Sequence, residues 1–141
     1  MKFDSEKFHF PNFKIIFDNL KCTLVPALTG TTSGTGYIAA KTVGELGGIV
    51  YLLNRPSARA DSALDKLQTE VPNGQFTQVD CDLQDFQSVN AAANEILSTQ
   101  TKIYCLANNA GIMDNEDMAT KDGFDVQMQT NHLSHFLLTA K

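Results

Sequence analysis

The chain has no long apolar run, no cluster of basic residues and only three cysteines. Charged residues and a proline interrupt the apolar residues near its N-terminus, so we expect neither a signal peptide nor a membrane-spanning segment. A formal net charge of -5 without a basic stripe disfavours nucleic acid as a partner. Cys22, Cys81 and Cys105 show no C-x-x-C spacing and lie in or beside apolar runs, which favours buried thiols over a disulfide or metal site. These absences indicate a soluble, cytoplasmic protein.

The 141 residues suffice for one domain with a hydrophobic core, and we assign that domain to residues 22–141. Residues 1–21 form a phenylalanine-rich N-terminal extension whose pattern predicts no particular structure. This extension could cover a sheet edge, pack against parts further along the chain, or result from an incorrect gene model.

Short apolar runs alternate with helix-period segments after residue 21, as in repeated βαβ units. The expected strands and helices, in chain order, are 22–28, 37–46, 49–54, 57–71, 76–80, 86–97, 102–108 and 124–141. Asp85 is the expected cap of the helix over 86–97. With right-handed crossovers, these elements predict an α/β fold with a doubly wound parallel sheet in the order 3-2-1-4. Pro26 argues against its strand, because proline lacks a ladder donor.

A glycine-rich turn, Thr29-Gly30-x-x-x-Gly34-x-Gly36, stands between the first expected strand and the first expected helix. Glycines there let backbone N–H groups approach a pyrophosphate at the positive end of the helix dipole. An ordinary strand-to-helix turn is the alternative, but the position favours nucleotide binding. No Gly-Lys-Ser/Thr follows, which excludes a P-loop.

Four motifs occur in order along the chain: "TGTTSGTG", "CDL", "NNAG" and "NHLSHFLLT". Together they resemble the N-terminal half of a short-chain dehydrogenase/reductase, in the branch of retinol-dehydrogenase-like and WW-domain-containing oxidoreductases. The resemblance covers about residues 24–141. It implies a Rossmann-like fold, a nicotinamide cofactor and, in a full-length form, a small-molecule carbonyl or alcohol substrate.

The resemblance also implies roles for individual residues. Asp82 would accept a hydrogen bond from the adenine, although it could instead cap a helix. Asn131 would belong to the catalytic tetrad and position a water in the proton relay, although an exposed helix residue is the alternative. The residues that the resemblance implies to bind the pyrophosphate, adenine and nicotinamide parts of the cofactor are Gly30, Ser33, Gly34, Gly36, Asp82, Asn108, Asn109, Ala110 and Gly111.

The second expected strand ends in Asn54-Arg55, where NAD-specific Rossmann units place an acidic residue on the ribose 2′-hydroxyl. Arg55 would instead bind the 2′-phosphate of NADP with two directed hydrogen bonds. We therefore expect NADP rather than NAD. Arg59 could assist from the next helix, although we expect a solvated surface charge there.

Two polar pairs in helical segments invite other functions. His132 and His135 stand three residues apart without a third ligand, so we expect surface or interface histidines and no metal. Tyr37 and Lys41 have the Tyr-x-x-x-Lys spacing of the resembled family's catalytic pair. Their helix runs away from the expected crevice, however, so we expect a packing role.

In the resembled family the catalytic serine and Tyr-x-x-x-Lys lie downstream of the fourth helical segment, and this sequence has neither there. The chain therefore reads as the NADP-binding portion of a short-chain oxidoreductase, truncated before strand 5 and inactive alone. A non-catalytic nucleotide-binding or interaction module is the alternative. A different Rossmann-like enzyme, such as one acting on nucleotide sugars, is a third interpretation. The open edge of the fourth strand would invite a homo-oligomer.

Overall fold

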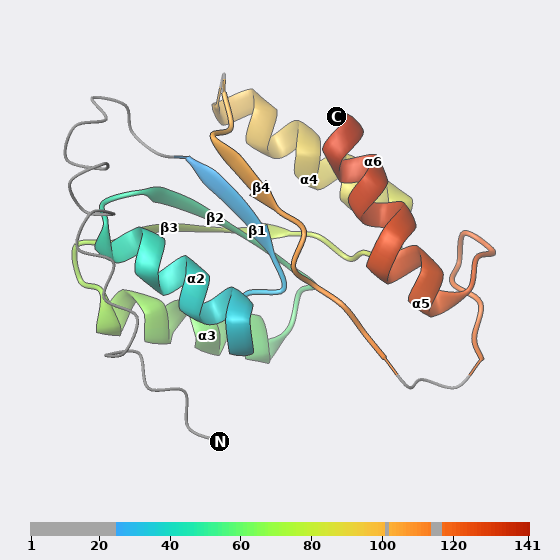
Figure 1. The fold of residues 1–141 in the computed structure, drawn as a ribbon, viewed down its shortest axis with the longest axis horizontal. Helices are drawn as coiled ribbons and strands as arrows, with labels where there is room; N and C mark the ends of the chain where they lie inside the picture. Colours follow the sequence, from blue (N-terminus) through green and yellow to red (C-terminus); the bar gives the residue numbers. More distant parts are fainter. Residues whose placement is uncertain (1–24, 101, 114–116) are drawn as a thin grey trace.

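The computed structural model describes residues 25–100, 102–113 and 117–141 (Figure 1). Within these ranges the sheet has four parallel strands, β1 (Pro26–Thr29), β2 (Ile49–Asn54), β3 (Gln75–Asp80) and β4 (Cys105–Ala107). Their order is β3-β2-β1-β4. This order confirms the doubly wound α/β fold that the βαβ pattern predicts. The N-terminal extension lies outside the described residues, so its boundary with the domain stays a prediction.

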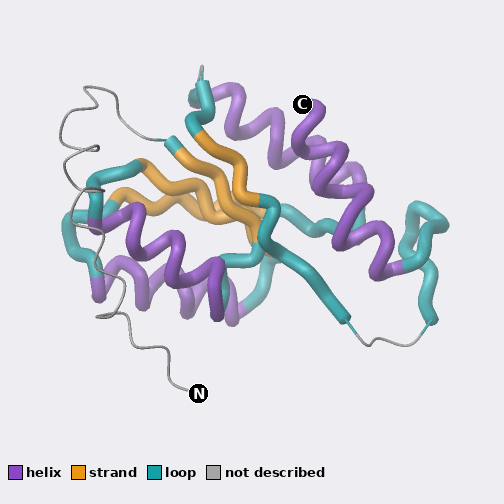
Figure 2. The backbone as a smooth tube through the Cα atoms, in the orientation of Figure 1, coloured by secondary structure: helices purple, strands orange, loops and turns teal. Residues whose placement is uncertain are grey.

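Helices cover both faces of the sheet (Figure 2). On one face lie α2 (Gly34–Glu45) and α3 (Ala58–Glu70). On the other lie α4 (Phe86–Thr99) and α6 (Ser134–Ala140). The sheet is therefore the middle layer of three, and only its edges and the ends of its strands are open to a ligand.

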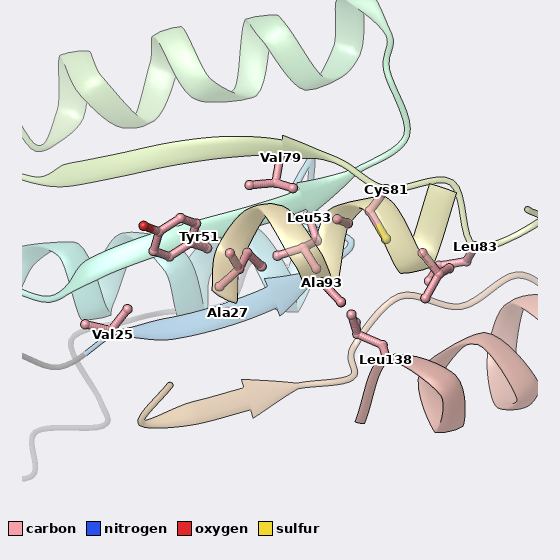
Figure 3. Close-up of a cluster of buried hydrophobic side chains, with 12 residues drawn as sticks. Val25, Ala27, Tyr51, Leu53, Val79, Cys81, Leu83, Ala93 and Leu138 are labelled. Atoms are coloured by element: carbon pink, nitrogen blue, oxygen red, sulfur yellow. The ribbon is translucent and has the colours of Figure 1, made fainter. Parts of the chain in front are cut away.

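The side chains of β2 alternate between the two helical layers. Val50 and Leu52 pack in the cluster beneath α2 and α3. Tyr51 and Leu53 pack in the cluster beneath α4 and α6 (Figure 3). Burial on both faces explains why residues 49–53 form an unbroken apolar run, as parallel central strands do.

Side-chain caps set the start of two helices. The Asp85 carboxylate accepts a hydrogen bond from Gln87 N at 2.8 Å, which confirms Asp85 as the cap of α4. Ser57 Oγ accepts one from Ala60 N at 3.3 Å and begins α3. These caps explain why both helices begin within one residue of the expected bounds.

The last expected helix is not a regular α-helix. It consists of α5 (Val126–Met128), a π-helical segment η2 (Gln129–Leu133) and then α6. Gln129 is fully buried, and its side chain hydrogen-bonds to Thr120 and Asp122. π segments occur often at functional sites, so this one directs interest to its residues.

Two expectations about strands are corrected. Pro26 begins β1, opposite Cys105 of β4, which is a position that tolerates proline. β4 is also shorter than the expected 102–108, and among the described strands only β1 pairs with it.

The expectation of buried thiols is corrected for Cys105, which is exposed in β4. Cys81 is buried, and its burial raises the pKa of the thiol to about 12. Cys22 lies outside the described residues.

Association of copies through the edge of β4 that no described strand covers stays a prediction.

None of the helices in the described ranges has both the length and the apolar composition to cross a bilayer. The cellular location also stays a prediction.

Candidate functional site

A cleft of about 490 Å³ opens at the carboxyl ends of the strands. The loops that follow β1, β2, β3 and β4 all contribute to its walls. This is the position at which open α/β sheets bind ligands, because the crossovers on either side of β1 diverge there. The described residues that line it include Gly30, Ser33, Gly36, Arg55, Arg59, Asp82, Asn109, Ala110, Gly111 and Thr130.

The glycines of the first loop permit direct backbone contact with the loop after β4. A Cβ on Gly30 would lie 2.8 Å from Ala110 Cα. A Cβ on Gly36 would lie 2.3 Å from the Gly30 carbonyl oxygen and 2.5 Å from Asn109 Nδ2. Gly34 differs because nothing lies within 4 Å of the position that a Cβ would occupy, although its φ of 59°, like the 69° of Gly30, favours glycine. Close approach therefore requires Gly30 and Gly36, and backbone conformation favours glycine at Gly30 and Gly34.

Thr29 joins the two loops through its hydroxyl. Its Oγ1 accepts hydrogen bonds from Asn109 N and Ala110 N, both at 3.0 Å, and lies 2.9 Å from His135 Nε2. The Thr29 side chain is fully buried. We call Thr29, Asn109, Ala110 and His135 the Thr29 hub. Sequence reasoning overlooked this role of Thr29, although its place at the end of a central strand, facing "NNAG", was a usable signal.

Asn109 strengthens the same junction from the other side. Its Nδ2 donates to the carbonyl oxygens of Thr29 at 3.0 Å and Gly30 at 3.2 Å. Asn108 instead reaches α6, where its Nδ2 donates to Thr139 Oγ1 at 2.9 Å. The "NNAG" turn thus holds the glycine loop with one asparagine and the last helix with the other.

Asn54 anchors the middle of the glycine loop. Its Oδ1 accepts from Thr31 N at 2.9 Å, and its Nδ2 donates to Thr31 Oγ1 at 2.8 Å. Both residues are buried. The sequence signal was an asparagine at the end of an otherwise apolar strand, which sequence reasoning treated only as the neighbour of Arg55.

Three polar residues line the mouth of the cleft. Ser33 is the N-cap residue of α2, and its side chain makes no capping hydrogen bond. Arg59 is exposed, as expected for a solvated surface charge, and its Nη2 also donates to Ser33 Oγ at 2.6 Å. Arg55 is exposed on the same wall. Two arginines therefore line the same cleft as the N-terminal residues of α2, which makes the cleft suited to an anion.

Asp82 lies on the wall after β3 and does not cap α4. Its Oδ1 accepts from Gln84 N at 2.9 Å, while Ser88 Oγ accepts from Asp82 N at 2.9 Å. The helix cap is Asp85. The carboxylate of Asp82 thus keeps further acceptor capacity toward the cleft.

Asn131 lies in η2 and binds the segment after "NNAG". Its Oδ1 accepts from Ile112 N at 2.8 Å, and its Nδ2 donates to the Ile112 carbonyl oxygen at 2.7 Å. Asn131 is exposed, as in the alternative expectation, but this paired contact also gives it a structural partner. Its role in proton transfer stays a prediction.

The family model for short chain dehydrogenases matches residues 25–141. The chain belongs to the short-chain dehydrogenase family. An uncharacterized oxidoreductase of Schizosaccharomyces pombe is 37% identical over 115 residues, which are 82% of this chain and 34% of that protein. Retinol dehydrogenase 12 of Bos taurus is 35% identical over 115 residues, 82% of this chain and 36% of that protein. The chain thus spans about a third of the length of these relatives, and the match to a retinol dehydrogenase agrees with the expected branch.

Solved structures of the family share the fold. A putative uncharacterized protein from Mycobacterium paratuberculosis has a TM-score of 0.71 at 34% identity, over 82% of this chain and 40% of that one. A metagenomic short-chain oxidoreductase in complex with NADP has a TM-score of 0.71 at 23% identity, over 83% of this chain and 53% of that one. These likenesses show that the chain shares its fold with both solved structures.

The histidines of this short-chain dehydrogenase chain occupy different environments. His132 is exposed, whereas His135 is buried, with its ring between Thr29 and the backbone carbonyl of Asn131. The expectation that both lie at a surface or interface is therefore wrong for His135. Burial lowers the pKa of His135. Among the described residues no three His, Cys, Asp or Glu side chains gather as metal ligands would.

Tyr37 and Lys41 lie away from the cleft, as expected from their helix. Tyr37 packs in the cluster beneath α2 and α3, and its hydroxyl donates to Glu70 Oε2 of α3 at 3.2 Å. Lys41 Nζ lies 3.0 Å from the same oxygen, and Lys66 Nζ lies 4.9 Å from the centroid of the Tyr37 ring. Burial and the hydrogen bond to Glu70 raise the pKa of Tyr37 to about 12. We call Tyr37, Lys41, Lys66 and Glu70 the Glu70 cluster, and it confirms the packing role.

Proposed function

We propose that the chain is the NADP-binding portion of a short-chain oxidoreductase that transfers hydride between NADP(H) and a carbonyl or alcohol. The observation that carries this proposal is the junction of the glycine loop with the "NNAG" turn at one cleft. The matches to retinol dehydrogenases support a lipophilic alcohol or aldehyde as the substrate.

The residues of the cleft fit the parts of a dinucleotide phosphate. A Cβ on Gly36 would fill the space against the loop, so the backbone cradle depends on glycine. The N-terminus of α2, with Gly34 and Ser33, would hold the pyrophosphate. Asp82 would accept from the adenine amino group, and Asn109 with Gly111 would line the nicotinamide side. The bound nicotinamide would supply or accept the hydride.

Arg55 is the proposed discriminator between NADP and NAD. A guanidinium at the end of β2 can bind a 2′-phosphate with two directed hydrogen bonds, and Arg59 adds a second cation on the same wall. Charge-assisted hydrogen bonds of this kind contribute roughly 1.5–3 kcal/mol, which corresponds to about 10- to 100-fold in affinity.

Calorimetric titration of the chain with NADPH and with NADH tests the proposal. We expect tighter binding of NADPH, and we expect Arg55→Asp to weaken NADPH binding by about 10- to 100-fold and to reverse the preference. Lys102→Asp makes the same change of charge outside the cleft and is the matched control. Binding of neither nucleotide would refute the cofactor assignment.

The chain's own residues support binding more clearly than proton transfer. The Tyr-x-x-x-Lys pair of the described residues, Tyr37 and Lys41, is engaged with Glu70 outside the cleft. We therefore propose that these 141 residues bind the cofactor without transferring hydride, which leaves a nucleotide-binding module as the second candidate function. Loss of NADPH absorbance on addition of retinaldehyde, dependent on the protein, would contradict this part of the proposal and favour the enzyme.

A further inference from the structure

His135 is a buried, ionisable side chain at the junction of three elements, and the proposed function assigns it no task. Only 6% of its surface is exposed. Its Nε2 lies 2.9 Å from Thr29 Oγ1 at the end of β1, and its Nδ1 lies 3.1 Å from the carbonyl oxygen of Asn131 in η2. The ring therefore bridges the strand that precedes the glycine loop and the helix that carries Asn131.

A count of hydrogen bonds at Thr29 assigns the tautomer of this ring. A hydroxyl oxygen has two lone pairs and one proton. Both lone pairs of Thr29 Oγ1 are taken by the amides of Asn109 and Ala110. Its proton has two possible acceptors, His135 Nε2 at 2.9 Å and the Ala107 carbonyl oxygen at 3.4 Å. The distance to Nε2 is the more typical of a hydrogen bond. Nε2 is then the acceptor, and Nδ1–H donates to Asn131.

The other forms of the ring do not satisfy this count. A proton on Nε2 would be a third donor directed at an oxygen with two lone pairs. In the neutral Nε2–H form, Nδ1 would carry no proton, so Nδ1 and the Asn131 carbonyl oxygen would be two acceptors facing each other without a donor. In the doubly protonated form, the Nε2 proton would compete with the two amides for Thr29 Oγ1.

We propose that His135, as the neutral Nδ1–H tautomer, is a positioning residue of the cofactor cleft that orients the Thr29 hydroxyl toward the amides of Asn109 and Ala110. By accepting the hydroxyl proton, it leaves both lone pairs of Oγ1 for those amides and so keeps the "NNAG" turn at its contact distance from the glycine loop. Its effect on binding rests on the proposed function, because the cleft that it orders is the proposed NADP site.

Protonation of His135 would oppose this arrangement. The charged groups on the neighbouring elements are few: Glu95 of α4 and His132 of η2 are exposed, β1 carries none, and β4 carries only the exposed thiol of Cys105. Burial lowers the pKa of His135, partly offset by the Asn131 carbonyl. The unfolded chain therefore takes up the proton first as pH falls, so the stability due to neutral His135 is present above about pH 6.5 and declines below it.

The first test reads the tautomer directly in the wild-type chain. Two-dimensional ¹⁵N–¹H NMR of labelled histidine distinguishes a protonated from an unprotonated ring nitrogen at each position. We expect a protonated Nδ1 and an unprotonated Nε2 for His135 at pH 7.5. An Nε2–H tautomer, or a doubly protonated ring, would overturn the proposal. This readout requires no cofactor, so it stands even if NADPH and NADH both fail to bind.

The second test uses two amide substitutions that differ in reach. In His135→Gln the amide takes the place of Nε2 and can accept the Thr29 proton, whereas in His135→Asn it takes the place of Nδ1 and cannot. We expect His135→Gln to bind NADPH within about threefold of wild type and His135→Asn to bind at least about tenfold more weakly, as for loss of one buried hydrogen bond. Equal effects of the two substitutions would overturn the proposal.

A pH series completes the comparison. We expect the free energy of unfolding of wild type, measured with urea, to fall from pH 7.5 to pH 5.5 more steeply than that of His135→Gln, because the unfolded chain takes up a proton that the buried ring resists. The difference between the two proteins cancels other titrating groups. Parallel pH profiles would contradict a neutral ring in the folded chain. Urea unfolding of both variants at pH 7.5 shows whether the change in NADPH affinity comes from loss of the fold.

Discussion

The Thr29 hub and the Glu70 cluster are two polar networks that each connect elements distant in sequence, but they differ in burial and charge. The hub is neutral, and its Thr29 hydroxyl is inaccessible to solvent. The cluster is ionic, and the side chains of Lys41, Glu70 and Lys66 are 31%, 30% and 63% exposed. Water reaches the ion pairs of the cluster but not the Thr29 hydroxyl. Burial therefore makes the loss of a hydrogen bond costlier in the hub than in the cluster.

The largest effect should come from adding one methyl group beside the hub. Gly36→Ala would place Cβ 2.3 Å from the Gly30 carbonyl oxygen in its own loop and 2.5 Å from Asn109 Nδ2 in the other, so the glycine loop must distort and the two loops must separate. We expect a loss of about 3 kcal/mol in the free energy of unfolding, measured with urea, or failure to fold. Gly34→Ala is the matched control, because it meets no atom and carries only the strain of a positive φ, about 1 kcal/mol. Equal losses in the two variants would show that the loops are not in contact.

Removing the hydroxyl of the hub should have the next largest effect. Thr29→Val keeps the shape of the side chain but leaves the amides of Asn109 and Ala110 without their acceptor. We expect unfolding to become easier by about 2 kcal/mol, since each unsatisfied donor costs about 1–3 kcal/mol when buried and these are partly buried. Thr29→Ser retains the hydroxyl and should lose only about 1 kcal/mol for its methyl group. A smaller loss for valine than for serine would mean that the hydroxyl has no such role.

The smallest effect should come from the Glu70 cluster. Glu70→Gln removes the charge that faces Lys41 and Tyr37, and we expect a change in stability well below that of Thr29→Val, vanishing in about 1 M salt. The hydrogen bond from Lys41 holds the pKa of Glu70 below its usual range, so any contribution is present at neutral pH and is lost as pH falls through that lowered pKa.

The same substitution should shift the titration of Tyr37. Burial and Glu70 raise the Tyr37 pKa to about 12, and Glu70→Gln removes the second cause while the first stays. We expect tyrosinate absorbance to report a Tyr37 pKa between the usual value near 10 and that of wild type. An unchanged titration would show that Glu70 does not contact the hydroxyl in solution.

Periodicity predicted the fold well because the central strands have a strong physical signature. Residues 49–54 form a strand with the expected bounds, since a strand buried on both faces must be apolar throughout. The fourth strand was predicted too long because an apolar run does not reveal that only one of the described strands pairs with it. The distortion in η2 also leaves no trace in a helical pattern, because it depends on the burial of Gln129.

The sequence predicted the glycine loop and the "NNAG" turn as parts of the candidate site, but it did not predict the residues that join these two segments. Glycine just after a central strand usually marks a tight turn or a close backbone approach, so Gly30 and Gly36 could be inferred from position. Thr29, Asn54 and His135 are common residue types whose importance comes from burial and from partners far along the chain. Such pairings cannot be read from local spacing. The bond between Arg59 and Ser33 was hidden for the same reason.

The position of Thr29 in the chain has a consequence for how the protein is made. Its three hub partners lie 80, 81 and 106 residues later in the sequence. A ribosome that adds about 5–20 residues per second needs roughly 5–20 s to synthesise that interval. The hydroxyl at the end of the central strand therefore exists well before any of the groups that satisfy it. The contacts between the two loops therefore form seconds after the glycine loop is synthesised, and a nascent chain that stops short of residue 135 holds that loop without its histidine.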